Sequence, residues 1–297
     1  MNTNTLKGYI FAIISAVIYG CMPLMANYIY SDGVNPFTLV FLRNCFSLIP
    51  LGILAYIEGK TLKIPLKALP KISLISILGC SVTPILLFCS YQFIPSGTAT
   101  VFHFVYPAFV VVGGILFCRK KAEISSIVSV VFCVIGIALF YTPGTPINFE
   151  GSFLALASAV SFASYVIILS RFNRSEVPGF LFTFYIVLIS SIISFFVCIT
   201  TGNLSLPASL FGWGLCILFS LLVTTGAVVL FQQSTFLIGG DRASILSTLE
   251  PITGLIIGIT VFSEPVSTAV IIGSVLVLSA SILTAIKDIK KNKRNIT

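Results

Sequence analysis

Three ionisable side chains lie inside long apolar runs of this sequence: Arg43, His103 and Glu250. A charge in apolar surroundings costs free energy, so such residues are kept where they pair with another group, relay protons or bind a ligand. Glu250, in the run 245–262, has two interpretations: a structural carboxylate bonded to a neighbouring helix, or a site for a substrate or a proton. His103 can relay protons or simply bond across helices, and Arg43 can pair structurally or face a substrate.

A common spacing links two pairs of polar residues. His103 and Tyr106 are three apart, as are Ser247 and Glu250. Residues three apart share one face of a helix, so each pair presents its polar groups together. We therefore expect both faces to line one site for substrate binding or proton coupling, with Arg43 as a further candidate.

A proline follows each of these pairs, at Pro107 and Pro251. A proline inside a helix removes a backbone hydrogen bond and kinks the helix, which frees carbonyl groups nearby. Two kinks beside polar residues suit a binding site, although they are also compatible with simple curvature of a helix bundle.

The remaining candidates are less specific. Tyr19 is a cavity candidate because a buried hydroxyl needs a partner, and Gln92, Gln232 and Gln233 are candidate hydrogen-bonding gates. The eight cysteines form no cluster with metal-ligand spacing, and we interpret them as small apolar packing residues. We expect no metal and no cofactor.

The composition predicts the kind of structure that holds these residues. Apolar residues make up 57% of the 297 residues and charged residues only 9%, whereas a soluble domain carries roughly a quarter charged residues. Only an integral membrane protein fits. The length of the apolar runs predicts helices rather than barrel strands, and we expect ten spans: about 8–29, 36–57, 72–92, 96–117, 124–141, 151–170, 178–199, 211–236, 243–262 and 267–286.

Basic residues define the expected orientation. With the N-terminus in the cytoplasm, sixteen of the seventeen lysines and arginines fall in cytoplasmic segments, and Arg43 lies within a span. This asymmetry follows the positive-inside rule and predicts a multi-pass protein of the cell membrane with both termini cytoplasmic. It explains the net charge of +8 without nucleic acid as a partner. We expect the basic tail 287–297 to lie near anionic lipid.

The chain also repeats itself. Ala12, Ala16 and Gly20 correspond to alanines at 155, 159 and 163, and residues 99–107 (ATVFHFVYP) align without gaps on 243–251 (ASILSTLEP). The shifts are 143 and 144 residues, which predicts a first repeat at 1–141, an extracytoplasmic linker at 142–149 and a second repeat at 150–286. Because each repeat holds five spans, the second enters the membrane from the opposite side. The predicted fold is all-α, with ten transmembrane helices as two inverted five-helix repeats.

The five-plus-five duplication, the proline in the fourth helix of each half and the LEP and FSEP stretches (249–251, 262–265) resemble the EamA family of the drug/metabolite transporter superfamily. The resemblance covers nearly the whole chain. It implies export or exchange of small metabolites, often amino acids or amines, by alternating access. The first half departs from the pattern, since FCRKK (117–121) has Lys120 where the second half has an acidic residue.

We therefore predict a secondary active transporter, not an enzyme, for a small neutral, zwitterionic or cationic metabolite. Few basic groups inside the spans argue against strongly anionic cargo. The alternatives are a membrane-embedded enzyme acting on a lipid-linked substrate and a non-transporting membrane scaffold. One histidine and nine acidic residues without paired-carboxylate spacing leave little for an enzyme, and inverted duplication is not required of a scaffold.

Overall fold

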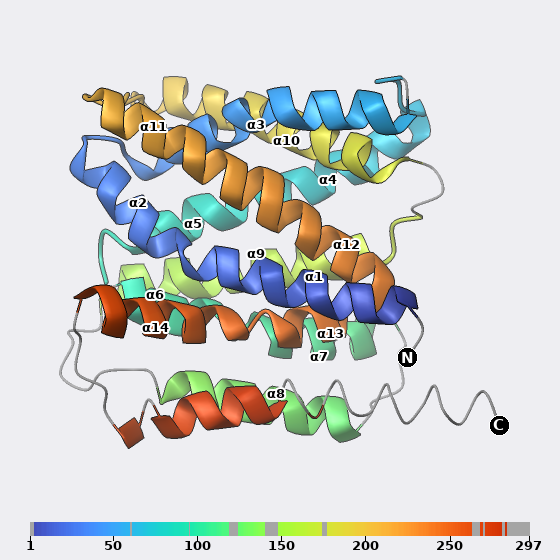
Figure 1. Ribbon diagram of the computed structural model, residues 1–297, viewed down its shortest axis with the longest axis vertical. Helices are drawn as coiled ribbons and strands as arrows, with labels where there is room; N and C mark the ends of the chain where they lie inside the picture. Colours follow the sequence, from blue (N-terminus) through green and yellow to red (C-terminus); the bar gives the residue numbers. More distant parts are fainter. Residues whose placement is uncertain are drawn as a thin grey trace.

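The computed structural model describes residues 3–59, 61–94, 96–118, 124–139, 148–173, 177–262, 268–269, 271–280 and 283. Within these residues all regular structure is helical, and most helices lie side by side along one direction (Figure 1). The all-helical class is thereby confirmed. Most of the 142–149 linker, the tail 287–297, and residues 119–121 and 263–265 lie outside the described residues.

Six helical stretches are long and apolar enough to cross a membrane: Thr3–Ser31, Pro36–Gly59, Leu66–Ser90, Phe149–Ser170, Gly179–Thr200 and Leu210–Ile238. Shorter apolar helices lie at Tyr106–Phe117, Ser126–Ala138 and Ile271–Ala280. Large apolar side chains on the outside, such as Ile57, Leu116 and Phe196, are more than half exposed. Such a surface suits contact with lipid rather than water, so this is a membrane protein with several spans.

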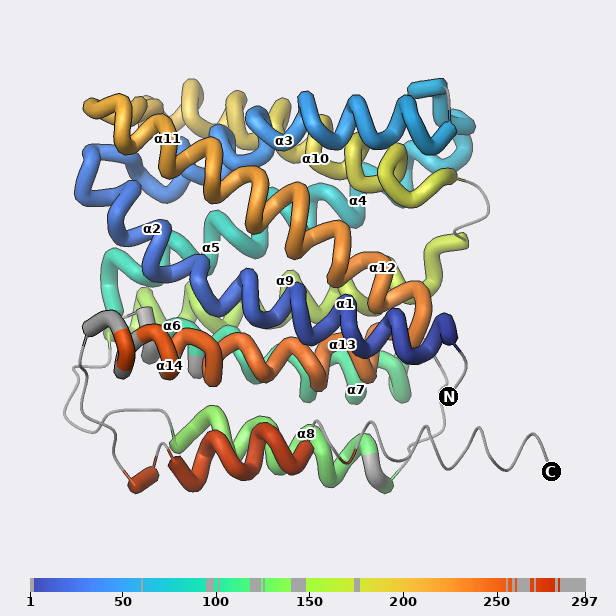
Figure 2. The backbone as a smooth tube through the Cα atoms, in the orientation of Figure 1, coloured from blue at the N-terminus to red at the C-terminus, as the bar shows by residue number. Residues whose placement is uncertain are grey.

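The elements are, in order, α1 (Thr3–Gly20), α2 (Met22–Ser31), α3 (Pro36–Gly59), η1 (Leu66–Ala68), α4 (Leu69–Ser76), η2 (Ile77–Val82), α5 (Thr83–Ser90), α6 (Ser96–His103), α7 (Tyr106–Cys118), α8 (Ile124–Ala138), α9 (Phe149–Ser170), α10 (Gly179–Thr200), α11 (Leu210–Phe219), η4 (Ser220–Val228), α12 (Val229–Ile238), α13 (Gly240–Leu246) and α14 (Leu249–Phe262). The tube in Figure 2 traces this order through the bundle.

Several spans are interrupted rather than straight. The first bends between α1 and α2, where Pro23 occupies the first turn of α2 and supplies no backbone N–H. The stretches Leu66–Ser90 and Leu210–Ile238 carry π-helical turns, η2 and η4, in their middle. Turns of this kind loosen the regular ladder of hydrogen bonds and are frequent at functional sites.

Helices α3 and α10 lie antiparallel along their whole length. At one end, Asn35 Nδ2 donates to the carbonyl oxygen of Asn203 at 2.7 Å. At the other, both carboxylate oxygens of Glu58 accept from the backbone N–H groups of Gly179 and Phe180, at 3.2 and 2.7 Å. Because those N–H groups open α10, Glu58 satisfies donors that its helix cannot satisfy itself.

Serine hydroxyls join this helix pair to the π-helical segments. Ser76, at the end of α4, donates to the carbonyl oxygen of Ile186 in α10 at 2.5 Å. Ser220, which begins η4, donates to the carbonyl oxygen of Arg43 in α3 at 2.6 Å. Such buried bonds fix the rotation of each helix against its neighbour.

Small residues let other helices approach closely. Ala12, Ala16, Ala155 and Ala159 are fully buried, and their small side chains let the helix backbones come close together. Gly20 lies where a side chain would not fit, next to the site described below. A Cβ at Gly20 would lie 2.5 Å from Thr253 Cβ and 2.8 Å from the carbonyl oxygen of Glu250. The glycine thus allows α14 to lie directly against the end of α1.

Outside the spans, Asp32 joins the end of α2 to the start of α11. Its carboxylate oxygen Oδ2 accepts from the backbone N–H of Ser209 at 3.1 Å. Hydrogen bonds from the side chain and the backbone of Ser209 hold the pKa of the Asp32 carboxyl below its ordinary value, because they favour the charged form.

Candidate functional site

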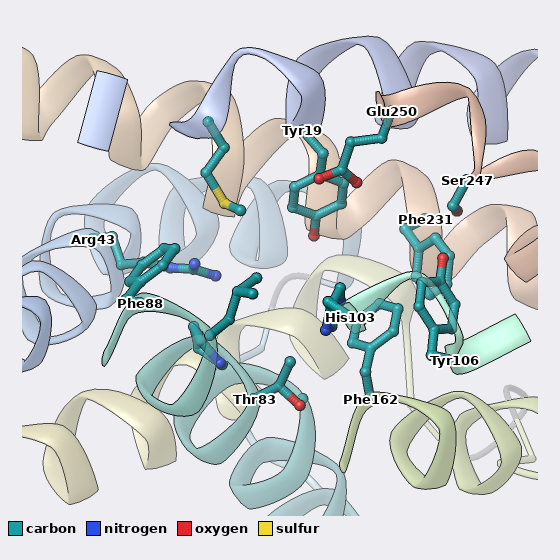
Figure 3. Close-up of a pocket in the computed structure, with 14 residues that line it drawn as sticks. Tyr19, Arg43, Thr83, Phe88, His103, Tyr106, Phe162, Phe231, Ser247 and Glu250 are labelled. Atoms are coloured by element: carbon teal, nitrogen blue, oxygen red, sulfur yellow. The ribbon is translucent and has the colours of Figure 1, made fainter. Parts of the chain in front are cut away.

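One cavity brings together residues from both halves of the chain. Its lining includes all six residues predicted to bind substrate or couple protons: Tyr19, Arg43, His103, Tyr106, Ser247 and Glu250. These come from α1, α3, α6, α7, the α13–α14 junction and α14. Figure 3 shows them around the cavity, with Arg43 on one side and Tyr106 on the other. Water-sized molecules have about 60 Å³ of free space inside, several times the roughly 10–15 Å³ that one water requires.

Arg43 supplies a guanidinium group with an unsatisfied hydrogen-bond donor. The residue is 4% exposed, and its Nε is buried with no hydrogen-bond partner among the described residues. A buried donor of this kind costs free energy unless a water or a ligand satisfies it. The guanidinium can present paired donors to a carboxylate, which makes Arg43 a natural anchor for an anionic group.

Glu250 supplies a carboxyl group to the same cavity. It opens α14 and remains partly exposed, and Figure 3 shows its carboxylate pointing into the cavity. Tyr19 lies between the side chains of Arg43 and Glu250 in this view, and all three line the cavity. The cavity therefore offers a guanidinium, a carboxyl group and a hydroxyl to a bound molecule.

His103 is oriented by a serine. Its Nδ1 lies 2.8 Å from Ser158 Oγ, and Ser158 already donates its hydroxyl proton to the carbonyl oxygen of Ala155 at 2.6 Å. Since a serine has only one proton to donate, His103 must be the donor in the first bond. A neutral His103 then carries its proton on Nδ1, and Nε2 is left as an acceptor.

Tyr106 bonds across to a distant segment of the chain, whereas Ser247 bonds within its own segment. The Tyr106 hydroxyl donates to the carbonyl oxygen of Ser244 at 3.4 Å, and Ser247 donates to the carbonyl oxygen of Ala243 at 2.9 Å. Both residues are buried. The predicted pairs thus lie at one cavity, as the shared spacing indicated.

The helix breaks occur just before the two prolines. α6 ends at His103 and α7 begins at Tyr106, next to Pro107. α13 ends at Leu246 and α14 begins at Leu249, two residues before Pro251. Discontinuous helices of this kind expose backbone groups at binding sites of transporters.

The glutamines do not line the cavity. Gln232 is buried, and its Oε1 accepts from the Thr183 hydroxyl at 2.6 Å, which joins α12 to α10. Gln92 is exposed beyond the end of α5, and Gln233 is partly exposed on α12. Their role as gates remains a prediction.

The rest of the lining was missed from the sequence: Met22, Gly79, Thr83, Pro84, Leu87, Phe88, Phe162 and Phe231. Nothing distinguishes these residues from the many others of the same types in apolar runs. The repeat could have found Phe162, because it lies 143 residues after Tyr19, which was a candidate. In the described part of the chain, no three His, Cys, Asp or Glu side chains gather where they could hold a metal ion.

Known proteins resemble this chain over nearly its whole length. The family model of the EamA-like transporter family matches twice, at residues 6–142 and 149–286. An uncharacterized transporter of Clostridium kluyveri is 22% identical, over 96% of this chain and 95% of its own. The uncharacterized inner membrane transporter YicL of Salmonella typhimurium is 24% identical, over 95% and 96%.

A solved crystal structure superposes with a TM-score of 0.78 at 17% identity, over 94% of this chain and 96% of the other. At this identity the superposition shows a shared fold alone. The two matches of the family model span nearly the whole chain. The chain therefore belongs to the EamA-like transporter family.

Proposed function

We propose that this protein is a secondary active transporter for a small neutral, zwitterionic or cationic metabolite of the amino acid or amine type. It works as an exporter or exchanger by alternating access. The observation that carries the proposal is the cavity shared by both halves, which is lined by both the Arg43 guanidinium and the Glu250 carboxyl group. Arg43 has a buried Nε without a partner, so a ligand carboxylate would satisfy it.

The charges favour a zwitterion within this range of substrates. A carboxylate on Arg43 and an ammonium group on Glu250 would neutralise both cavity charges at once, whereas a polyanion would find only one cation there. Phe88, Phe162 and Phe231 supply apolar walls for the remainder of the molecule. A site that combines apolar walls with a few placed polar groups is typical of small-molecule binding.

Several observations support two inverted five-helix repeats as the basis of alternating access. The family model matches each half separately. Helices α3 and α10, related by the 143-residue shift, run antiparallel, as equivalent helices do in inverted repeats. The bonds from Ser76 to Ile186 and from Ser220 to Arg43 connect equivalent positions, since the donors differ by 144 residues and the acceptors by 143.

Proton coupling through Glu250 follows from the same geometry. A carboxyl that holds a proton in one state and a substrate ammonium in the other would exchange the two across the membrane. His103, whose Nε2 is an acceptor, lines the same cavity and can pass that proton.

The test is transport by the purified protein in liposomes. A thermal-shift panel of amino acids and amines first identifies a ligand, because a ligand of the folded state raises the melting temperature. Saturable counterflow of that ligand, lost in Arg43→Gln, supports the proposal. Turnover of a labelled lipid would instead indicate the enzyme, and a folded protein with neither flux nor turnover would indicate the scaffold.

A further inference from the structure

The two groups proposed to hold a zwitterion come from different sides of the cavity. Arg43 lies on α3 and Glu250 on α14, and in Figure 1 the helix α1, which carries Tyr19, passes between these two helices. Figure 3 shows the same order among the side chains, with Tyr19 between Arg43 and Glu250. Both residues are described and line the cavity, and no hydrogen bond or ion pair joins them. The guanidinium and the carboxyl group are therefore two separate subsites.

Different neighbours hold the two subsites. The carbonyl oxygen of Arg43 accepts from the Ser220 hydroxyl at 2.6 Å, which ties this turn of α3 to η4. Glu250 instead lies against the end of α1, where a Cβ on Gly20 would be 2.8 Å from its carbonyl oxygen. Helix counting adds a difference in depth, because the two residues lie roughly 10 Å in from opposite faces of a core about 30 Å thick. Each subsite therefore keeps its own position in the bundle.

The described lining limits the charges that a ligand can carry. Glu250 is its one acidic residue, and Arg43 supplies its one guanidinium. A second ammonium group on the ligand would find no second carboxyl group there, and an unpaired charge in apolar surroundings costs free energy. A second carboxylate would likewise find no second guanidinium. The lining therefore fits a molecule with one carboxylate and one ammonium group.

The separation of these groups decides which molecule can reach both subsites. In an α-amino acid the ammonium nitrogen and the carboxylate carbon are bonded to one carbon, so they lie roughly 2.5 Å apart. Such a molecule contacts Arg43 or Glu250 and leaves the other without a partner, and a buried group without a partner costs free energy. An ω-amino acid carries the same two groups at the ends of a methylene chain and can reach both subsites.

The cavity also limits the length of that chain. Its free space of about 60 Å³ corresponds to roughly four to six water-sized groups, so only a few methylene groups fit. The rings of Tyr19, Phe88 and Phe162 line this space. Methylene groups that pack against these rings leave water, which favours binding. A short chain between two charged ends thus matches the middle of the cavity as well as its two subsites.

We propose that the cavity selects a short ω-amino acid, with its carboxylate on Arg43, its ammonium group on Glu250 and its methylene chain along the ring of Tyr19. This inference deepens the proposed function and rests on it, because it names the class of zwitterion that is transported. Tyr19 is then a specificity-determining residue, since its ring lies where the chain passes. An α-amino acid occupies one subsite only and is a poor substrate.

The test compares isomers on the purified full-length protein by thermal-shift titration. γ-Aminobutyrate and α-aminobutyrate contain the same atoms and the same two charged groups, and they differ in the distance between these groups. β-Alanine and alanine form a second, shorter pair. We expect the γ isomer to bind roughly ten- to hundredfold more tightly than the α isomer, the range for one lost hydrogen bond to a charged group. β-Alanine should bind more tightly than alanine for the same reason.

Two variants assign the ends of the ligand. Butyrate carries only the carboxylate, and butylamine carries only the ammonium group. Butyrate binding should be lost in Arg43→Gln and kept in Glu250→Gln, whereas butylamine should show the reverse. γ-Aminobutyrate should weaken in both variants. The matched controls are Arg171→Gln and Glu150→Gln, because both residues are exposed at the ends of α9 and neither lines the cavity. These controls should bind every probe as the wild type does.

Equal or tighter binding of the α isomer would overturn the inference, as would a γ isomer that does not raise the melting temperature. This comparison uses the wild type alone, so it stands even where a variant fails to fold. Loss of butyrate and butylamine binding together in one folded variant would overturn the assignment of the two ends.

Liposome counterflow separates this inference from the proposed function. Saturable exchange of α-amino acids alone would support a transporter and refute the ω-amino acid class. The expected isomer pattern without any flux would support the two subsites and refute transport.

Discussion

Substituting Gly20 by alanine should separate the helices that position Glu250. The added Cβ would lie 2.5 Å from Thr253 Cβ, about 1 Å inside the normal separation of two carbon atoms. Its second neighbour, at 2.8 Å, is the carbonyl oxygen of Glu250, and neither atom can rotate away. Overpacking of this kind costs about 1–3 kcal/mol, whereas replacing a glycine in a helix returns only about 0.5–1 kcal/mol. The cost of the clash therefore outweighs the gain, and we expect Gly20→Ala to lower the free energy of unfolding.

Gly254→Ala provides the matched control on the facing helix. A Cβ there would lie 3.7 Å from the carbonyl oxygen of Gly20, an ordinary contact. We expect the melting temperature of the purified protein to fall in Gly20→Ala and to stay level or rise in Gly254→Ala. The apparent substrate affinity should weaken only in Gly20→Ala, because the displaced segment carries Glu250. A Gly20→Ala protein that melts at or above the wild-type temperature would refute this account of the α1–α14 contact.

Three further predictions concern charge and topology. Glu250→Gln should fold and reach the membrane but lose pH-dependent transport, since the amide keeps the shape of the side chain but cannot titrate. If Glu250→Gln transports normally with an unchanged pH profile while Glu250→Ala fails to fold, the carboxylate is structural. Because the folded-state pKa of Asp32 is lowered, its contribution to stability is present above the unfolded value of about 3.9 and is lost as pH falls through the folded pKa. The melting temperatures of the wild type and Asp32→Asn should therefore converge in acid, and a constant difference down to pH 3 would contradict this assignment. Pro146→Cys in a cysteine-free chain should react with an impermeant reagent from outside the cell, and reaction only from the cytoplasmic side would reverse the expected orientation.

Much of the candidate site could be predicted from local patterns. An ionisable side chain within an apolar run costs free energy unless it contacts a partner or a ligand. The positions of Glu250, His103 and Arg43 in such runs were therefore enough to make them candidates. His103 and Tyr106 are three residues apart, as are Ser247 and Glu250, and residues at this spacing share one face of a helix. Each pair could therefore be predicted to lie together from neighbouring positions alone. The two prolines indicated interrupted helices for the same reason, and the breaks lie just before them.

Gln232 shows what local reasoning cannot find. It is predicted as a gate because a polar side chain stands within a span, and the structure adds that its oxygen accepts from the Thr183 hydroxyl of another helix. The partner lies 49 residues away in sequence, and no periodicity within one helix can reveal it.

The amino-acid sequence was enough to predict the membrane class, the helices and the residues that are too costly in lipid without a partner or a ligand. These follow from transfer free energies and helical repeats, which depend on neighbours a few positions apart. The tertiary structure alone decided that Arg43 and Glu250 line one cavity, although helix counting places them at depths of roughly 10 Å from opposite faces. It alone decided that Phe162 packs on Phe231 and that Tyr19 lies between Arg43 and Glu250. The physical reason is that these contacts join helices distant in the chain, and their geometry is set by packing between helix surfaces.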